Sequence, residues 1–153
     1  MSKCVTISNE IMLGSVKELV AEGHPVIIMT KGVSMLPFIE GKKDSVLLEK
    51  RGKVIRGDIA LAEIRPGRYV LHRVIKTEGD EVTLKGDGNS LGMEHCFQKN
   101  IAGVVAEIQR PGRDPVDPSS AYQQRRWRLW VSIPAVVRRY YLGFYRRIKH
   151  ITI

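Results

Sequence analysis

The chain has 153 residues and a formal net charge of +9, with 25 Lys and Arg against 16 Asp and Glu. The charge is uneven, because residues 125–153 hold eight basic residues and no acidic one, whereas residues 1–124 are nearly neutral. The length suits one domain with an appendage, and the asymmetry excludes a uniformly basic protein. It predicts an anionic partner for the C-terminal tail, either a membrane surface or nucleic acid.

No stretch reaches the roughly 18 apolar residues that a membrane-spanning helix needs. The first ten residues lack the basic start and the apolar segment of a signal peptide, so we expect no leader and no N-terminal anchor. The two cysteines, Cys4 and Cys96, indicate free thiols in a reducing compartment rather than a disulfide or a metal site. We therefore expect a cytoplasmic protein with no cofactor.

In chain order, residues 9–22 place apolar side chains at helical spacing after Ser8 or Asn9 as a cap, and Gly23 ends this predicted helix. The β-branched run at 26–30 predicts a strand. Further strands are predicted at 45–50, 58–64, 69–76, 81–86 and 101–109, with glycine-rich turns between them. Many short strands after one helix predict a mostly β fold class, a small and strongly bent antiparallel β domain.

The C-terminal part of the sequence has no strand pattern. The prolines and charges of RPGRDPVDPSS at 110–120 indicate a linker. We therefore predict a β domain with its N-terminal helix over 1–109, a linker over 110–124 and a basic helical tail over 125–153.

The tail has the pattern of an amphipathic helix that Pro134 starts or kinks. Its apolar stripe, preceded by Trp127 and Trp130, comprises Leu129, Ile133, Val136, Val137, Tyr140, Tyr141, Phe144 and Ile148. The basic side chains lie largely off this stripe, which is typical of a helix on an anionic membrane surface. Packing of the stripe on the body is the alternative, and nucleic acid is disfavoured because no recognised nucleic-acid motif accompanies the charge.

Two short segments supply residues suited to acyl transfer. KGVSMLP at 31–37 places Ser34 in a tight turn after a strand, and YVLHRVIK at 69–76 places His72 within a strand. A serine hydroxyl needs an adjacent base to become a nucleophile, and histidine is the usual one. Taken singly, Ser34 fits a turn cap and His72 fits a satisfied core residue.

A third segment, LKGDGN at 84–89, ends a strand and places Asp87 at the tip of a glycine turn. A carboxylate there is suited to hold the tautomer of His72 and to stabilise its imidazolium form. The alternative is an ordinary turn in which Asp87 bonds its own backbone.

GVSMLP, RGDIALAEI, YVLHRVI and LKGDGN occur in this order, and together they resemble the boxes of type I signal peptidases and of the related LexA-type repressors. The resemblance covers about residues 25–109, and His72 makes the chain similar to the serine–histidine branch of the endoplasmic reticulum and archaea. It implies that Ser34 is the nucleophile, His72 the general base and Asp87 the leading candidate to orient the base. Arg73 and Asp58 would be structural, and Lys76 would be a solvated strand residue.

Three positions depart from that pattern. The endoplasmic-reticulum branch has a further aspartate after its GDN box, where this chain offers Glu94, so Asp87 and Glu94 both remain candidates for the acid. Gly32 stands where many signal peptidases have a serine that binds the oxyanion, so backbone N–H groups of Val33 or Ser34 would have to do so. The N-terminal anchor of signal peptidases has no counterpart here, which makes the basic tail a candidate for membrane attachment at the inner face.

The sequence thus predicts a serine endopeptidase that cleaves a leader-like or signal-like peptide through an acyl-enzyme on Ser34. We expect the substrate to lie extended beside a strand edge near 25–33, with small side chains before the cleaved bond, as the resemblance implies. Two alternatives belong to other classes: an inactive relative that only binds or scaffolds peptides, and a peripheral membrane adaptor that acts through the tail.

Overall fold

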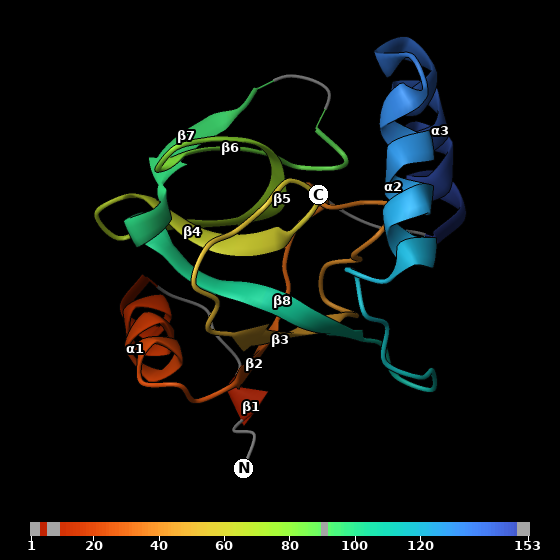
Figure 1. Cartoon of the computed structure of the whole chain (residues 1–153). Helices are drawn as coiled ribbons and strands as arrows, with labels where there is room; N and C mark the ends of the chain where they lie inside the picture. Colours follow the sequence, from red (N-terminus) through yellow and green to blue (C-terminus); the bar gives the residue numbers. More distant parts are fainter. Residues whose placement is uncertain (1–3, 6–9, 90–91, 150–153) are drawn as a thin grey trace.

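The fold is built on one strongly bent eight-stranded sheet, seen in the computed structural model that describes residues 4–5, 10–89 and 92–149 (Figure 1). The strand order is β1-β2-β3-β8-β4-β5-β6-β7, and every neighbouring pair is antiparallel except β1 and β2, which are parallel. The strands are β1 (Cys4–Val5), β2 (Val26–Met29), β3 (Ser45–Glu49), β4 (Ile59–Arg65), β5 (Arg68–Glu78), β6 (Glu81–Lys85), β7 (Glu94–Phe97) and β8 (Ile101–Gln109). The predicted mostly β class is confirmed.

Most elements of the body fall where their sequence pattern predicts them. The predicted N-terminal helix is α1 (Glu10–Ala21), and the predicted strands correspond to β2, β3, β4, β5, β6 and β8 within a few residues. The proposed caps Ser8 and Asn9 lie outside the described residues. Strand β7 is not predicted, because its four residues, EHCF, carry no apolar alternation. A 3-10 turn (Gln98–Asn100) joins β7 to β8.

The core consists of two apolar clusters, because the sheet curls far enough to enclose side chains on both of its faces. One cluster lies between α1 and the strands β2, β3 and β8, and includes Val16, Val46 and Leu48. The other lies inside the curl of β4, β5 and β6, and includes Val74 and Leu84. Bulges in the β4–β5 and β5–β6 pairings give the bend.

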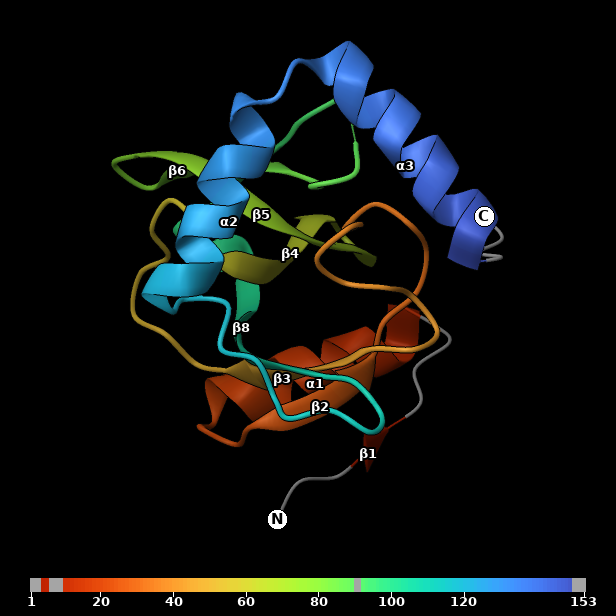
Figure 2. The same ribbon diagram turned by 90° about the vertical axis from the view of Figure 1, so that its right-hand side faces the viewer.

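The C-terminal region forms two helices, where the sequence predicts one helix that Pro134 starts or kinks. α2 spans Ala121–Ser132 and α3 spans Ala135–Lys149, and the break falls at the Ile133–Pro134 step. Because proline cannot donate an N–H inside a helix, the break at this step is the physical consequence of Pro134. Figure 2 shows the two helices as an inverted V that stands beside the sheet.

In the predicted linker over 110–124, part of the chain contacts the body and the last residues belong to a helix. Val116 pairs with Ile108 of β8, and Pro118 is buried. α2 already begins at Ala121, where the Ser120 hydroxyl accepts a hydrogen bond from the N–H of Gln123 at 3.3 Å. The segment that connects body and helices is therefore held against the body.

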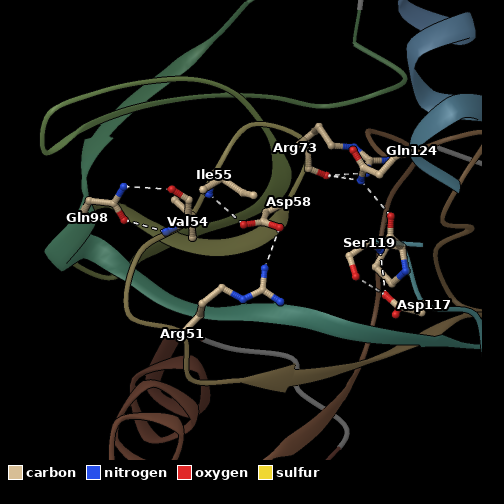
Figure 3. A network of polar contacts seen from close by, with 11 residues as sticks. Arg51, Val54, Ile55, Asp58, Arg73, Gln98, Asp117, Ser119 and Gln124 are labelled. Carbon is tan, nitrogen blue, oxygen red and sulfur yellow. Dashed lines mark hydrogen bonds and ion pairs between the residues drawn. The ribbon is translucent and has the colours of Figure 1, made fainter. Parts of the chain in front are cut away.

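α2 is attached to the body by two buried indoles and by a shared carbonyl group. Trp127 is 2% exposed and Trp130 is 7% exposed. The Gln124 amide donates to the carbonyl of Gly57 at 3.0 Å, and the Arg73 guanidinium of β5 donates to the same oxygen at 3.0 Å (Figure 3). This arrangement joins α2, the loop before β4 and β5 at one point.

Candidate active site

Ser34 lies in a turn that two neighbouring side chains anchor in the core. The chain leaves β2, passes Gly32 with a φ of 77°, and turns through residues 34–38. Met35 and Leu36 are almost fully buried, and the N–H of Phe38 donates to the carbonyl of Met35 at 3.0 Å. Because these anchors face inward, Ser34 remains half-buried at the wall of a cavity.

His72 faces the serine from β5. Its Nε2 lies 3.2 Å from Ser34 Oγ, and the His72 side chain is 9% exposed. β5 places His72 opposite Ala60 of β4. The structure thus brings together the two residues in which the sequence suggested a nucleophile and its base.

The carboxylate behind His72 belongs to Glu94. Its Oε2 lies 2.9 Å from His72 Nδ1, and its side chain is 20% exposed. A carboxylate only accepts hydrogen bonds, so with Glu94 ionised Nδ1 carries the proton and donates it. Nε2 of the neutral ring is then free to accept the hydroxyl proton of Ser34, which is the protonation state that a general base requires.

Asp87, the leading candidate from the sequence, contacts a different residue. Its carboxylate accepts two hydrogen bonds from the Arg73 guanidinium, at 3.2 and 2.7 Å. The reason is the alternation of β5, which points His72 and Arg73 to opposite faces of the strand. The prediction that Asp87 orients His72 is therefore corrected in favour of Glu94, and the prediction of a structural position for Arg73 agrees with these contacts.

The Arg73–Asp87 pair is fully enclosed. Both side chains are 2% exposed. Burial raises the pKa of the Asp87 carboxyl, and the positive charge of Arg73 opposes that rise. The guanidinium lies 5.1 Å from the ring centre of Trp127 and 5.4 Å from that of Phe38, so aromatic faces surround the cation.

The glycine turn at 86–88 brings this ion pair next to the serine. A Cβ on Gly86 would lie 2.5 Å from the Ser34 carbonyl oxygen and 3.3 Å from His72 Nε2. The Gly88 N–H donates to that same Ser34 carbonyl at 2.8 Å. Both glycines are required because the two loops touch through their backbones, so the LKGDGN segment packs directly against the turn that carries Ser34.

An apolar cavity of about 310 Å³ opens beside Ser34 and His72. Its walls come from α1, the end of β2, the serine turn, β4 and β5. The aliphatic and aromatic side chains that line it are Leu13, Ile28, Met29, Met35, Ile39, Leu61, Tyr69, Val70 and Leu71. A site that combines a nucleophile–base pair with an adjacent apolar cavity has the usual form of an enzyme pocket.

Several backbone donors at the cavity wall have no acceptor within the described part of the chain, among them the N–H groups of Gly32, Ser34 and Met35. Among the described residues, the Ser34 N–H donates no hydrogen bond to another group. The turn holds the neighbouring N–H of Leu36 on the carbonyl of Val33 at 3.2 Å. A free N–H beside a nucleophile is the kind of group that stabilises an oxyanion.

The other residues considered from the sequence have local structural contacts. The Asp58 carboxylate accepts hydrogen bonds from Arg51 at 2.7 Å and from the N–H of Ile55 at 2.9 Å (Figure 3). Lys76 is exposed and pairs with Glu78 at 3.5 Å. Cys96 is a buried free thiol whose pKa burial raises, while the side chain of Cys4 lies outside the described part of the structure.

The edge of β2 is partly occupied. β1 pairs with Ile27 and Ile28, within the range 25–33 that the sequence suggests for an extended substrate. Residues 29–32 lie beyond this pairing and line the cavity. The part of the edge that can receive another strand is therefore shorter than predicted.

Comparison with protein-family models and with curated proteins finds no match to this chain. Within the described residues, no helix combines the length and the apolar character needed to cross a membrane. The functional conclusion therefore depends on the site itself.

Proposed function

We propose that the protein is a serine endopeptidase with Ser34 as nucleophile, His72 as general base and Glu94 as the carboxylate that orients the base. The observation that carries the proposal is the continuous contact from Ser34 Oγ to His72 Nε2 and from His72 Nδ1 to Glu94 Oε2. The three groups come from a turn, from β5 and from β7, and their joint alignment is what nucleophilic catalysis requires.

In the proposed reaction, Ser34 Oγ attacks the carbonyl carbon of the scissile peptide bond while His72 Nε2 accepts the hydroxyl proton. The tetrahedral intermediate collapses as His72 returns this proton to the leaving amine, and an ester on Ser34 remains. Water then attacks the ester with His72 again acting as base, which releases the acid and restores the hydroxyl. Glu94 stabilises the imidazolium in both steps through its 2.9 Å contact with Nδ1.

The Ser34 N–H is the proposed donor to the oxyanion. Such a donor typically lowers the barrier by about 3 kcal/mol. Gly32, two residues earlier, offers no side-chain hydroxyl for this purpose. The proposed site therefore stabilises the oxyanion through the backbone alone.

The proposed substrate is an extended peptide beside residues 29–32, bound by main-chain hydrogen bonds. A side chain next to the scissile bond enters the apolar cavity between β2 and β5. Together with the order of the four boxes and the bent β body, these features support a fold of the signal peptidase and LexA type. A leader-like or signal-like peptide is accordingly the proposed class of substrate.

Substitution of the two reacting residues tests the proposal. We expect Ser34→Ala and His72→Ala to lower kcat by about 10²-fold or more, measured on a library of unstructured peptides, because general-base help alone is worth about 10²- to 10⁴-fold. A fluorophosphonate probe should label the natural chain and neither variant.

Two matched controls accompany these variants. Ser132→Ala removes an exposed serine and His95→Ala removes an exposed histidine of β7, and both should keep full activity and labelling. Peptide binding without labelling or turnover would instead identify an inactive peptide-binding module. Undiminished cleavage by Ser34→Ala would refute the mechanism.

A further inference from the structure

α3 presents an exposed apolar face on the outside of the molecule. The face comprises Val136, Val137, Tyr140, Tyr141, Phe144 and Ile148, which recur at spacings of three and four along the helix. Their exposed fractions run from 48% for Tyr141 to 77% for Tyr140. Scattered exposed apolar residues are normal, whereas a continuous apolar face along one helix indicates a binding surface.

A different side of α3 contacts the rest of the protein. Tyr141, at the edge of the apolar face, packs edge-on against Trp130 of α2 with ring centres 5.5 Å apart. Leu142 and Tyr145 are half-buried, and Tyr145 lines a hollow with Arg110, which directly follows β8. These contacts attach α3 to the rest of the protein. Its exposed apolar face is therefore not needed for packing and can bind a partner.

The charge around this face is uniformly positive. α3 carries Arg138, Arg139, Arg146, Arg147 and Lys149, and the sequence has no acidic residue after Asp117. Among the described residues, none of these five cations forms an ion pair with a carboxylate. Arg139, Arg147 and Lys149 are exposed, so their charge is available to an external anion, whereas Arg138 and Arg146 are half-buried with a buried Nε.

We propose that the exposed face of α3 binds the surface of an anionic lipid bilayer, with the helix lying in the plane of the headgroups. Aromatic and aliphatic side chains suit the boundary between headgroups and acyl chains, and flanking arginines suit the phosphates. The proposal is independent of peptidase activity.

Charge distinguishes this partner from the two other candidates. A second copy of the chain would bring two positive surfaces together around the apolar face, which like-charge repulsion opposes. A nucleic acid would satisfy the arginines but would leave Val136, Val137 and Ile148 without an apolar partner. A bilayer with anionic lipids offers an apolar partner to the aliphatic and aromatic side chains and phosphates to the arginines.

Flotation of the full-length chain with vesicles tests the proposal. We expect binding to mixed phosphatidylcholine and phosphatidylglycerol vesicles and at least about tenfold weaker binding to pure phosphatidylcholine, with a strong loss in high salt. Tyr140→Ser with Phe144→Ser should weaken binding at least about tenfold by removing apolar contact. Arg139→Gln with Arg147→Gln should weaken it roughly 10- to 30-fold and should flatten the salt dependence.

The matched control removes the same charge elsewhere. Lys50→Gln with Lys53→Gln changes two exposed cations on the loop after β3 and should bind like the natural chain. Circular dichroism must show an unchanged fold for all three double variants. Three outcomes would overturn the proposal. They are equal binding to both vesicle types, an equal loss of binding in the lysine control, and a concentration-dependent dimer that the Tyr140 and Phe144 changes abolish.

Discussion

At the scale of single residues, the site contains two carboxylates with one basic neighbour each. Glu94 contacts His72, which changes charge during the proposed reaction, and Asp87 contacts Arg73, which does not. The first contact is partly exposed to water and the second is enclosed. Neutralising Glu94 should therefore mainly lower activity, whereas neutralising Asp87 should mainly lower stability.

We expect Glu94→Gln to lower kcat by roughly 10²-fold or more while the free energy of unfolding changes by less than about 1 kcal/mol. Asp87→Asn should lower the free energy of unfolding by about 3–5 kcal/mol, because it leaves the buried guanidinium of Arg73 without a counter-charge. Chemical denaturation followed by tryptophan fluorescence measures the stability, and peptide cleavage measures kcat.

The paired design separates the two positions. If Asp87→Asn folded as stably as the natural chain and lost activity as Glu94→Gln should, Asp87 would be the acid of the site after all. Equal stability losses in both variants would mean that Glu94 is also a purely structural residue.

Sequence reasoning singled out Ser34 and His72 because their segments occur in order with RGDIALAEI and LKGDGN, whereas each residue taken singly fits a structural position. It favoured Asp87 over Glu94, because the glycine turn made Asp87 conspicuous. The pattern of β5 contained a contrary signal, since neighbouring residues of a strand point to opposite faces and Asp87 has a cation available in Arg73. The pairing of Glu94 with His72 depends on the register of β7 on β6, which no local pattern determines.

At the scale of elements, α2 is part of the framework of the site. Trp130 Nε1 donates to the carbonyl of Asp87 at 2.8 Å, inside the glycine turn that touches the Ser34 backbone. Trp130 also packs edge-on against Phe38, which follows the serine turn, with ring centres 6.5 Å apart. The C-terminal region thus contributes contacts to the two loops that meet at Ser34.

We expect Trp130→Phe to lower the free energy of unfolding by about 1–3 kcal/mol, because it keeps an aromatic ring but leaves the buried carbonyl of Asp87 without its donor. Activity on a peptide should fall as well, since the turn at 86–88 loses a restraint. The measurements are denaturant unfolding and kcat at a temperature where the variant is folded.

Leu129→Ala is the matched control on α2. Leu129 is 62% exposed, so its truncation should change stability by no more than about 0.5 kcal/mol and leave kcat unchanged. If Trp130→Phe changed neither the free energy of unfolding nor kcat, α2 would not be part of the framework of the site.

The position of α2 also bears on the predicted linker over 110–124, because α2 begins at Ala121. Proline and charge in 110–120 do indicate a break in regular structure, and the structure has one there. Burial of Pro118 and Trp127 depends on the surface that the body offers, which composition does not reveal. The amphipathic pattern of 127–148 mixed residues of two helices, because the helical period continues in the sequence across Pro134.

At the scale of the whole molecule, the proposed active site and the proposed lipid-binding face belong to one chain, and α2 contacts elements of both. α3 contacts α2 through Tyr141 and Trp130, and α2 contacts the glycine turn through Trp130 and Asp87. A bilayer bound to α3 would hold the peptidase body at a short, fixed distance from lipid. Substrates anchored in the same bilayer would then meet the site at a raised effective concentration.

We therefore expect anionic vesicles to accelerate the cleavage of a vesicle-anchored peptide by at least about tenfold over the same peptide free in solution. Tyr140→Ser with Phe144→Ser should abolish this acceleration and leave cleavage of the free peptide unchanged, because these exposed side chains lie outside the cavity beside Ser34. Cleavage rates with and without vesicles measure both effects. An equal loss on free and anchored peptide would show that α3 supports the catalytic body itself, whereas an acceleration that survives the double variant would place the lipid contact elsewhere on the chain.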